Sequence, residues 1–112
     1  MNPKLYILVR SDLTPGQQAV QAAHAAFGFA RHHRGIMEEW FDTSEYLVLL
    51  QVPDERALKT YALHAINLSI YMHAQVEPDM DDAVTAVALE PGLVTQQLLS
   101  ELPLALREES MV

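Results

Sequence analysis

Hydrophobic residues gather in four short runs along this chain, and polar turns or segments with helical spacing separate them. The runs are Leu5–Val9, Glu45–Val52, Ser69–Val76 and Val84–Leu89, and each has the length of a β-strand. The second run is almost continuously apolar, which is typical of a strand covered on both faces. The third alternates apolar and polar positions, which predicts a half-exposed strand.

Three further segments predict helices. The first spans about residues 15–34, the second starts after Asp54 as its N-cap, and the third spans about residues 93–102. We expect Asn67 to end the second helix in the left-handed conformation. Residues 36–44 are expected to form a loop or a partial turn, anchored by Trp40 and Phe41.

The first helix has the clearest start signal. Thr14 is a good N-cap, Pro15 suits the first helical position, and Gln17 completes a Thr-x-x-Gln capping box. Abundant alanine favours the helix and allows close packing on a sheet. The face toward the sheet is predicted to be the stripe at helical spacing, formed by Val20, Ala23, His24 and Phe27.

The order β-α-β-α-β-β-α predicts a single layered α/β domain over the 112 residues. Helical crossovers join the first three strands, so these strands are expected to be parallel. The short connection over residues 77–83 implies an antiparallel final pair. The tail from about residue 103 is expected to be loosely held.

Composition narrows the possible functions. The net charge is −8, which argues against broad adhesion to nucleic acid because phosphate neutralisation needs clustered Lys and Arg. A small basic spot is still possible, since Arg10, Arg31 and Arg34 all lie in the first third of the chain. The absence of cysteine excludes disulfides, thiolate catalysis and zinc–thiolate sites. With neither a membrane-length apolar run nor a signal-peptide pattern, we expect a cytoplasmic protein that does not enter membranes.

The turn between the first strand and the first helix is the best candidate for chemistry. It brings Arg10, Asp12 and the backbone N–H groups near Gly16 to a helix N-terminus, which favours a phosphate or a developing negative charge. Asp12 either positions Arg10 or a water there, or only caps the turn.

Three stretches resemble the type 2 peptidyl-tRNA hydrolase (Pth2) family. They are Val9–Leu13 (VRSDL) followed by Gly16, then Ala19–Ala25 (AVQAAHA), and Thr85–Pro91 (TAVALEP). A weaker similarity covers Leu63–Ile70. The resemblance implies a three-layer fold, a four-stranded mixed sheet with helices on both faces, often dimeric. It also implies hydrolysis of the ester that joins a peptide to tRNA, with no cofactor.

The chain departs from the family pattern at two places. The two lysine positions of the family's glycine-lysine turn fall on Pro15 and Gln17, which carry no charge. The family's aspartate loop is also missing: an ungapped match places the aspartate on Gln75, and a gap moves Glu77 or Asp79 there. Loss of one transition-state contact from lysine would lower the rate roughly 10²- to 10³-fold.

Within this resemblance, His24, Glu77 or Asp79 would activate water, with Asp12 in support. The residues that would hold the substrate are Arg10 and Arg31 at tRNA phosphates, Gln21 at a ribose or the backbone, and the N–H groups of Gly16 and Gln17 with the Thr85 hydroxyl at the oxyanion or terminal phosphate.

Each of these residues also has a plainer interpretation. His24 would be a packing histidine, and the acids of residues 77–82 a solvated loop. We expect no metal, because the acidic spacing does not match an EF-hand and the adjacent pair His32–His33 lacks the i, i+4 spacing of a helical zinc site. The alternative function is a non-catalytic family member that binds a tRNA end, a nucleotide or a protein partner. A third is the same fold acting on another small ester or amide.

Overall fold

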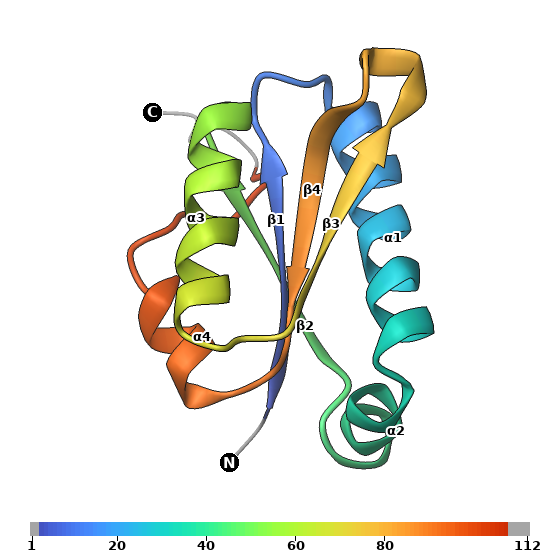
Figure 1. The fold of residues 1–112 in the computed structure, drawn as a ribbon, viewed down its shortest axis with the longest axis vertical. Helices are drawn as coiled ribbons and strands as arrows, with labels where there is room; N and C mark the ends of the chain where they lie inside the picture. The colour runs from blue at the N-terminus through green and yellow to red at the C-terminus, as the bar shows by residue number, and fades with distance from the viewer. Residues whose placement is uncertain (1–2, 108–112) are drawn as a thin grey trace.

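The computed structural model describes residues 3–107 and has a single four-stranded sheet between two layers of helices (Figure 1). The elements in chain order are β1 (Lys4–Arg10), α1 (Pro15–His32), α2 (Arg34–Thr43), β2 (Tyr46–Val52), α3 (Glu55–Asn67), β3 (Met72–Glu77), the 3₁₀ turn η1 (Pro78–Met80), β4 (Ala83–Leu89) and α4 (Leu93–Leu98).

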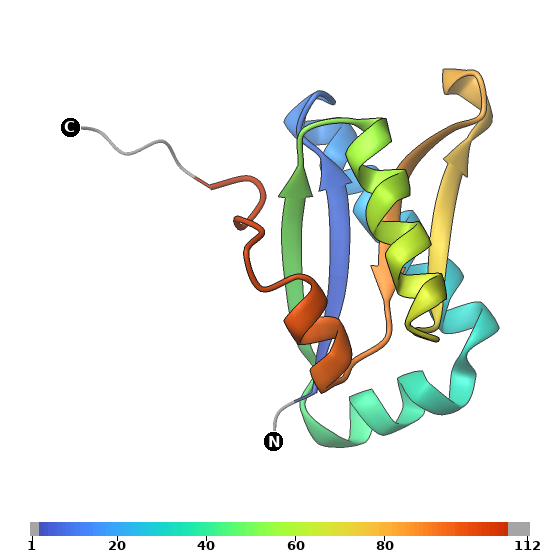
Figure 2. The same ribbon diagram turned by 60° about the vertical axis from the view of Figure 1, so that its left-hand side comes forward.

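The strand order is β2-β1-β4-β3. β1 and β2 are parallel, whereas β4 runs antiparallel to both β1 and β3. Helices α1 and α3 cover opposite faces of the sheet (Figure 2). The predicted mixed sheet with helices on both faces is therefore confirmed, as are the parallel first pair and the antiparallel last pair.

β1 is central because its side chains are buried on both faces. Leu5, Ile7 and Val9 pack toward α1 and α2, and Tyr6 and Leu8 pack toward α3 and α4. Strict alternation along an extended chain sends successive side chains to opposite faces. An apolar run such as this one therefore needs a helix on each side of the sheet.

The prediction of which face of α1 points toward the sheet is wrong. The stripe that contains Val20 and Phe27 faces solvent, with Phe27 75% exposed, and His24 is exposed as well. The residues that α1 buries are Gln18, Gln21, Ala22, Ala25 and Phe29. Both sets have helical spacing, but at 100° per residue their centres lie on opposite sides of the helix, about 180° apart. Alanine occurs in both, so hydrophobic periodicity alone did not separate the two faces.

With this face of α1 turned inward, the helix lies in close contact with β3. Gly28 faces His73, and a Cβ at Gly28 would overlap the His73 ring. Gly28 thus allows the helix to approach the strand closely. The His73 ring also lies 5.6 Å from that of His32.

Residues 36–44 were predicted as a loop or a partial turn, but most of them belong to the helix α2 (Arg34–Thr43). Trp40 is buried and donates its indole Nε1–H to the Tyr46 carbonyl at 2.8 Å, whereas Phe41 is 54% exposed. Only Trp40 of the expected pair is therefore buried against the body. This indole hydrogen bond connects α2 to β2 and so stabilises the helix.

Three smaller expectations also differ from the structure. Asn67 still belongs to α3, and the left-handed residue after the helix is Ser69, with φ of 59°. α4 ends at Leu98 rather than near residue 102. The tail expected to be loose from about residue 103 pairs with β2: Gln51 N–H donates to the Pro103 carbonyl at 3.0 Å, and Ala105 N–H donates to the Leu49 carbonyl at 2.9 Å. Residues 108–112 of that tail lie outside the described residues.

Candidate functional site

A partly buried hydrogen-bond network joins α1, β3 and β4. The side chain of Gln21 lies at its centre: its Nε2 donates to Glu77 Oε2 at 3.0 Å, and its Oε1 accepts from Thr85 Oγ1 at 2.6 Å. Gln21 is 6% exposed and Thr85 is fully buried. An ionised carboxylate only accepts hydrogen bonds, so the Gln21 amide must turn its nitrogen toward Glu77 and its oxygen toward Thr85.

Glu77 closes this network at the end of β3. Its other oxygen, Oε1, accepts from the Asp79 backbone N–H at 3.2 Å. The hydrogen bond from Gln21, then that from Asp79 N–H, lower the pKa of the Glu77 carboxyl, and the nearby His24 lowers it further. Glu77 is therefore a carboxylate at neutral pH.

The Thr85 hydroxyl reaches Gln21 because of a β-bulge. Gln75 pairs with Ala86 and Val76 pairs with Val84, so Thr85 is an extra residue in β4 without a partner in β3. A bulge rotates the side chains that follow it. The effect here is that Thr85 points to the α1 face together with Ala86, whereas Val84 packs on the α3 face.

His24 lies one helical turn after Gln21 and is exposed to solvent. The prediction that the His24 imidazole lies on an inward-facing stripe is therefore wrong. His24 is nevertheless close enough to Glu77 to affect the pKa of the Glu77 carboxyl. Asp79 is exposed and contributes only its backbone N–H to Glu77. The structure brings Gln21, His24, Glu77 and Thr85 together at one end of the sheet.

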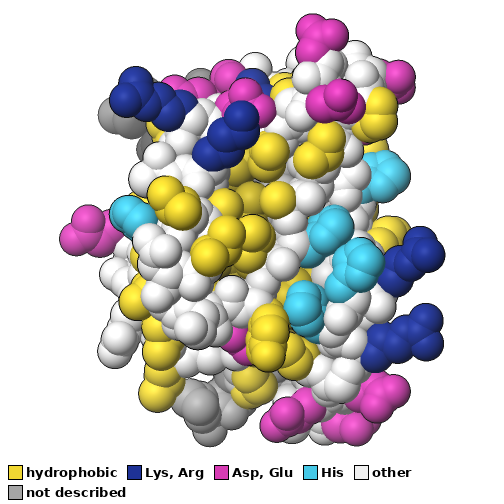
Figure 3. Space-filling view, viewed as in Figure 1, with side chains coloured by type: hydrophobic (Ala, Val, Ile, Leu, Met, Phe, Trp, Pro, Cys, Tyr) yellow, Lys and Arg dark blue, Asp and Glu magenta, His cyan; other side chains and the backbone are white. Residues whose placement is uncertain are grey.

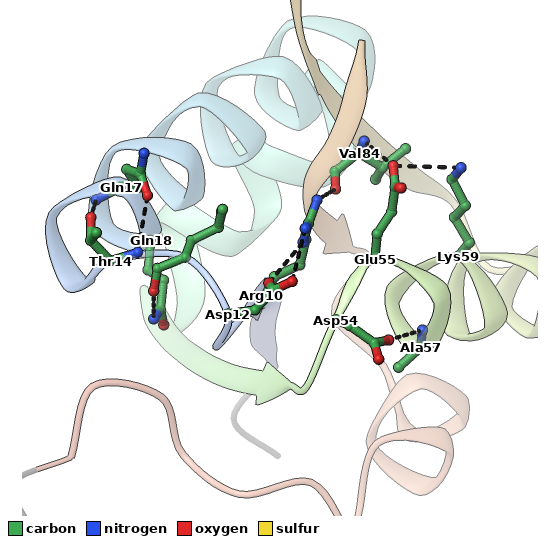
Figure 4. Close-up of polar contacts among 11 residues, drawn as sticks. Arg10, Asp12, Thr14, Gln17, Gln18, Asp54, Glu55, Ala57, Lys59 and Val84 are labelled. Carbon is green, nitrogen blue, oxygen red and sulfur yellow. Dashed lines mark hydrogen bonds and ion pairs between the residues drawn. The ribbon is translucent and has the colours of Figure 1, made fainter. Parts of the chain in front are cut away.

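Arg10 and Asp12 form a two-pronged ion pair. Arg10 Nε donates to Asp12 Oδ1 at 3.0 Å, and Nη2 donates to Oδ2 at 2.9 Å (Figure 4). This pairing raises the pKa of Arg10 and lowers that of Asp12. Arg10 Nη1 donates to the Val84 carbonyl at 3.2 Å. The contacts to Asp12 hold the guanidinium at the turn after β1, and the contact to Val84 brings it to β4.

At the start of α1, the Gln17 N–H was predicted to bind an anion, but it takes part in the helix cap instead. Gln17 N–H donates to Thr14 Oγ1 at 3.1 Å, and Thr14 N–H donates to Gln17 Oε1 at 3.0 Å, which confirms the capping box. Gly16 is exposed and has open space around it. Arg31 lies fifteen residues further along the helix, which places it about 22 Å from Gly16 at 1.5 Å per residue.

Sequence reasoning missed Glu55, the first residue of α3. Glu55 Oε2 accepts from the Val84 backbone N–H at 2.8 Å, and this bond is the main cause of the lowered pKa of Glu55 (Figure 4). An acid in the first turn of a helix is common, so no local signal indicated this contact. It depends on how α3 packs against β4.

The sequence profile of the family described as peptidyl-tRNA hydrolase PTH2 matches residues 3–104. The chain belongs to this family. The family prediction made from the VRSDL and AVQAAHA stretches is thereby confirmed. Membership of the family supports a function related to tRNA substrates.

A solved structure of a protein of unknown function, Atu0240, from Agrobacterium tumefaciens strain C58, is similar to this PTH2 chain. Its TM-score is 0.68, with 14% sequence identity, over 93% of this chain and 98% of that chain. At that identity the likeness concerns the fold. No curated protein matches the chain.

No positive charge lies at the two positions of this PTH2 chain where the sequence resemblance places lysine. The two lysine positions hold Pro15, which starts α1, and Gln17, whose side chain is engaged in the cap. Within residues 3–107, no group of three or more His, Asp or Glu side chains is arranged to hold a metal ion. Over the same residues, no helix is both long and apolar enough to cross a membrane.

Proposed function

We propose that this PTH2 chain hydrolyses the ester between a peptide, or an N-blocked amino acid, and the terminal ribose of tRNA. The observation that carries the proposal is the Gln21–Glu77–Thr85 network, with His24 beside it at one end of the sheet. It joins a fixed carboxylate, an amide and an accessible imidazole in a member of a peptidyl-tRNA hydrolase family.

In the proposed reaction, neutral His24 takes a proton from water as its oxygen attacks the ester carbonyl. Glu77, kept ionised by Gln21, stabilises the imidazolium that forms. The tetrahedral intermediate then breaks its bond to the ribose oxygen, and the imidazolium returns the proton to that oxygen. Asp79 is the alternative carboxylate and Asp12 supports the site through Arg10.

The Thr85 hydroxyl is committed to Gln21, so its proposed role is to orient the amide rather than to meet the oxyanion. Gln21 has a second N–H that is not needed for Glu77, and this group, with the Gly16 N–H, is the proposed donor to the substrate. A neutral donor stabilises an oxyanion less than a lysine would, which predicts a slow enzyme.

The tRNA is proposed to lie along α1. Figure 3 shows histidine and arginine side chains gathered on the side of the molecule that α1 and β3 form. Arg31 and His32 are exposed there, and the His32 ring lies beside that of His73 in a tilted arrangement. Basic and aromatic groups of this kind suit phosphates and unpaired bases. We further propose a cytoplasmic location and a homodimer.

The test is release of free tRNA from N-acetylaminoacyl-tRNA by the purified protein. His24→Ala should remove most of the activity, whereas His64→Ala, an exposed histidine on α3, serves as the matched control and should retain it. Gln17→Lys restores a charge at a family lysine position and should raise the rate. No turnover by the native chain above background, with turnover by Gln17→Lys, would refute the hydrolase proposal.

A second candidate function is binding of a tRNA end without hydrolysis. It is favoured by the capped, uncharged helix start, where Gln17 replaces a lysine. A gel shift with tRNA that persists at physiological salt, in the absence of turnover, would support it, because purely electrostatic binding weakens steeply with salt.

A further inference from the structure

The bulge at Thr85 lies where β4 loses its neighbour β1. Pairing between β1 and β4 extends only to Val9 opposite Ala86. Beyond that point β1 turns toward α1, so the backbone of Val84 has no strand to pair with on that side. Unpaired backbone groups at such a position need other partners.

Two side chains take the place of the missing strand. Arg10 Nη1 donates to the Val84 carbonyl at 3.2 Å, and Glu55 Oε2 accepts from the Val84 N–H at 2.8 Å. Figure 4 shows the two side chains reaching Val84 side by side, one from the end of β1 and one from α3. Both main-chain groups of the residue before Thr85 are thereby held.

Each of these side chains is itself held. Asp12 accepts two hydrogen bonds from Arg10, and the Arg10 side chain is only 14% exposed. Lys59 Nζ lies 3.5 Å from Glu55 Oε2, one helical turn further along α3. Asp54 fixes the start of that helix by accepting from Ala57 N–H at 2.9 Å. Opposite charges therefore alternate from the β1 turn to α3.

We propose that Arg10 and Glu55 are positioning residues that hold the Thr85 bulge in register, and through Thr85 the Gln21 amide and the Glu77 carboxylate. The kinetic test of this positioning role rests on the proposed function, because it measures ester hydrolysis. The reason is geometric: slippage at Val84 by one residue would turn Thr85 to the other face of the sheet and remove its hydroxyl from Gln21. Arg10 is accordingly assigned to β4 rather than to tRNA phosphates.

The test compares Glu55→Ala with Glu55→Gln. Glutamine keeps an oxygen that can accept from Val84 N–H, whereas alanine removes it. Arg56→Ala, an exposed change at the next position of α3, is the matched control. In ester hydrolysis we expect Glu55→Ala to lower kcat about tenfold with little change in KM, and Glu55→Gln and Arg56→Ala to remain within about twofold of the native chain.

A second measurement does not depend on activity. In ¹H–¹⁵N NMR spectra, Glu55→Ala should shift both the Thr85 backbone amide and the Gln21 side-chain amide, and Glu55→Gln should shift them much less. Shifts that stop at Val84 and leave the Gln21 amide unchanged would overturn the positioning role. A native chain without hydrolase activity would refute the proposed function, while the NMR result would still decide the positioning role.

Discussion

Replacing Thr85 by valine removes one hydroxyl from the network and changes little else. Valine has nearly the same shape, so the cavity term is small and the lost hydrogen bond dominates. Thr85 is fully buried and Gln21 is 6% exposed, so water cannot easily replace the hydroxyl that now lies 2.6 Å from Gln21 Oε1. Leaving a buried acceptor unpaired costs about 1–3 kcal/mol.

We therefore expect Thr85→Val to lower the free energy of unfolding by about 1–3 kcal/mol, measured by urea denaturation at pH 7. The double variant Gln21→Leu/Thr85→Val removes both partners, so its loss should be smaller than the sum of the single losses by about 1 kcal/mol or more. Thr60→Val is the matched control: its hydroxyl donates to the Arg56 carbonyl on an exposed face of α3, and the change should stay within about 0.5 kcal/mol.

The reasoning would be refuted by a Thr85→Val variant as stable as the Thr60→Val control. Additive losses in the double variant would also contradict it, because additivity would mean that Gln21 and Thr85 do not interact.

Two further changes test the turn and the tail. Because the ion pair with Arg10 lowers the pKa of Asp12, its stabilisation is present above the unfolded pKa of about 4 and is lost as the pH falls through the lower folded value. Asp12→Asn should therefore reduce stability at pH 6 and flatten its decline below pH 4 in urea titrations; an unchanged acid limb would contradict this. Ala105→Pro removes the N–H that donates to the Leu49 carbonyl and should cost about 1–2 kcal/mol by thermal unfolding, whereas a freely moving tail would give no loss.

Much of the candidate site could be found from the sequence, but its connections could not. The AVQAAHA stretch identified Gln21 and His24, and the acidic segment contained Glu77. The bond between Gln21 and Glu77 joins residues 56 positions apart, and no local spacing indicates which acid of residues 77–82 turns toward α1. Glu55 was missed for the same reason, since its partner is the Val84 backbone on another element.

Local chemistry was sufficient where the determining contacts are near in sequence. The capping box at Thr14 fixes the start of α1, Asp54 fixes the start of α3, and the unbroken apolar run of β1 requires a covered position in the sheet. Each of these signals acts within a few residues or through strict alternation along a strand. The sequence alone therefore determined the four strands, the starts of α1 and α3, the mixed sheet and its two helical layers, but not the helix α2.

Tertiary structure decided which face of α1 is buried, because two alanine-containing stripes on opposite sides of the helix were both consistent with helical spacing. The contact of Gly28 with His73 and the polar network of Gln21 select the observed face. It also decided the bulge at Thr85, which arises where β1 leaves β4 and side chains from two other elements take its place. Both outcomes depend on contacts between distant segments, whose energies exist only after the layers have packed.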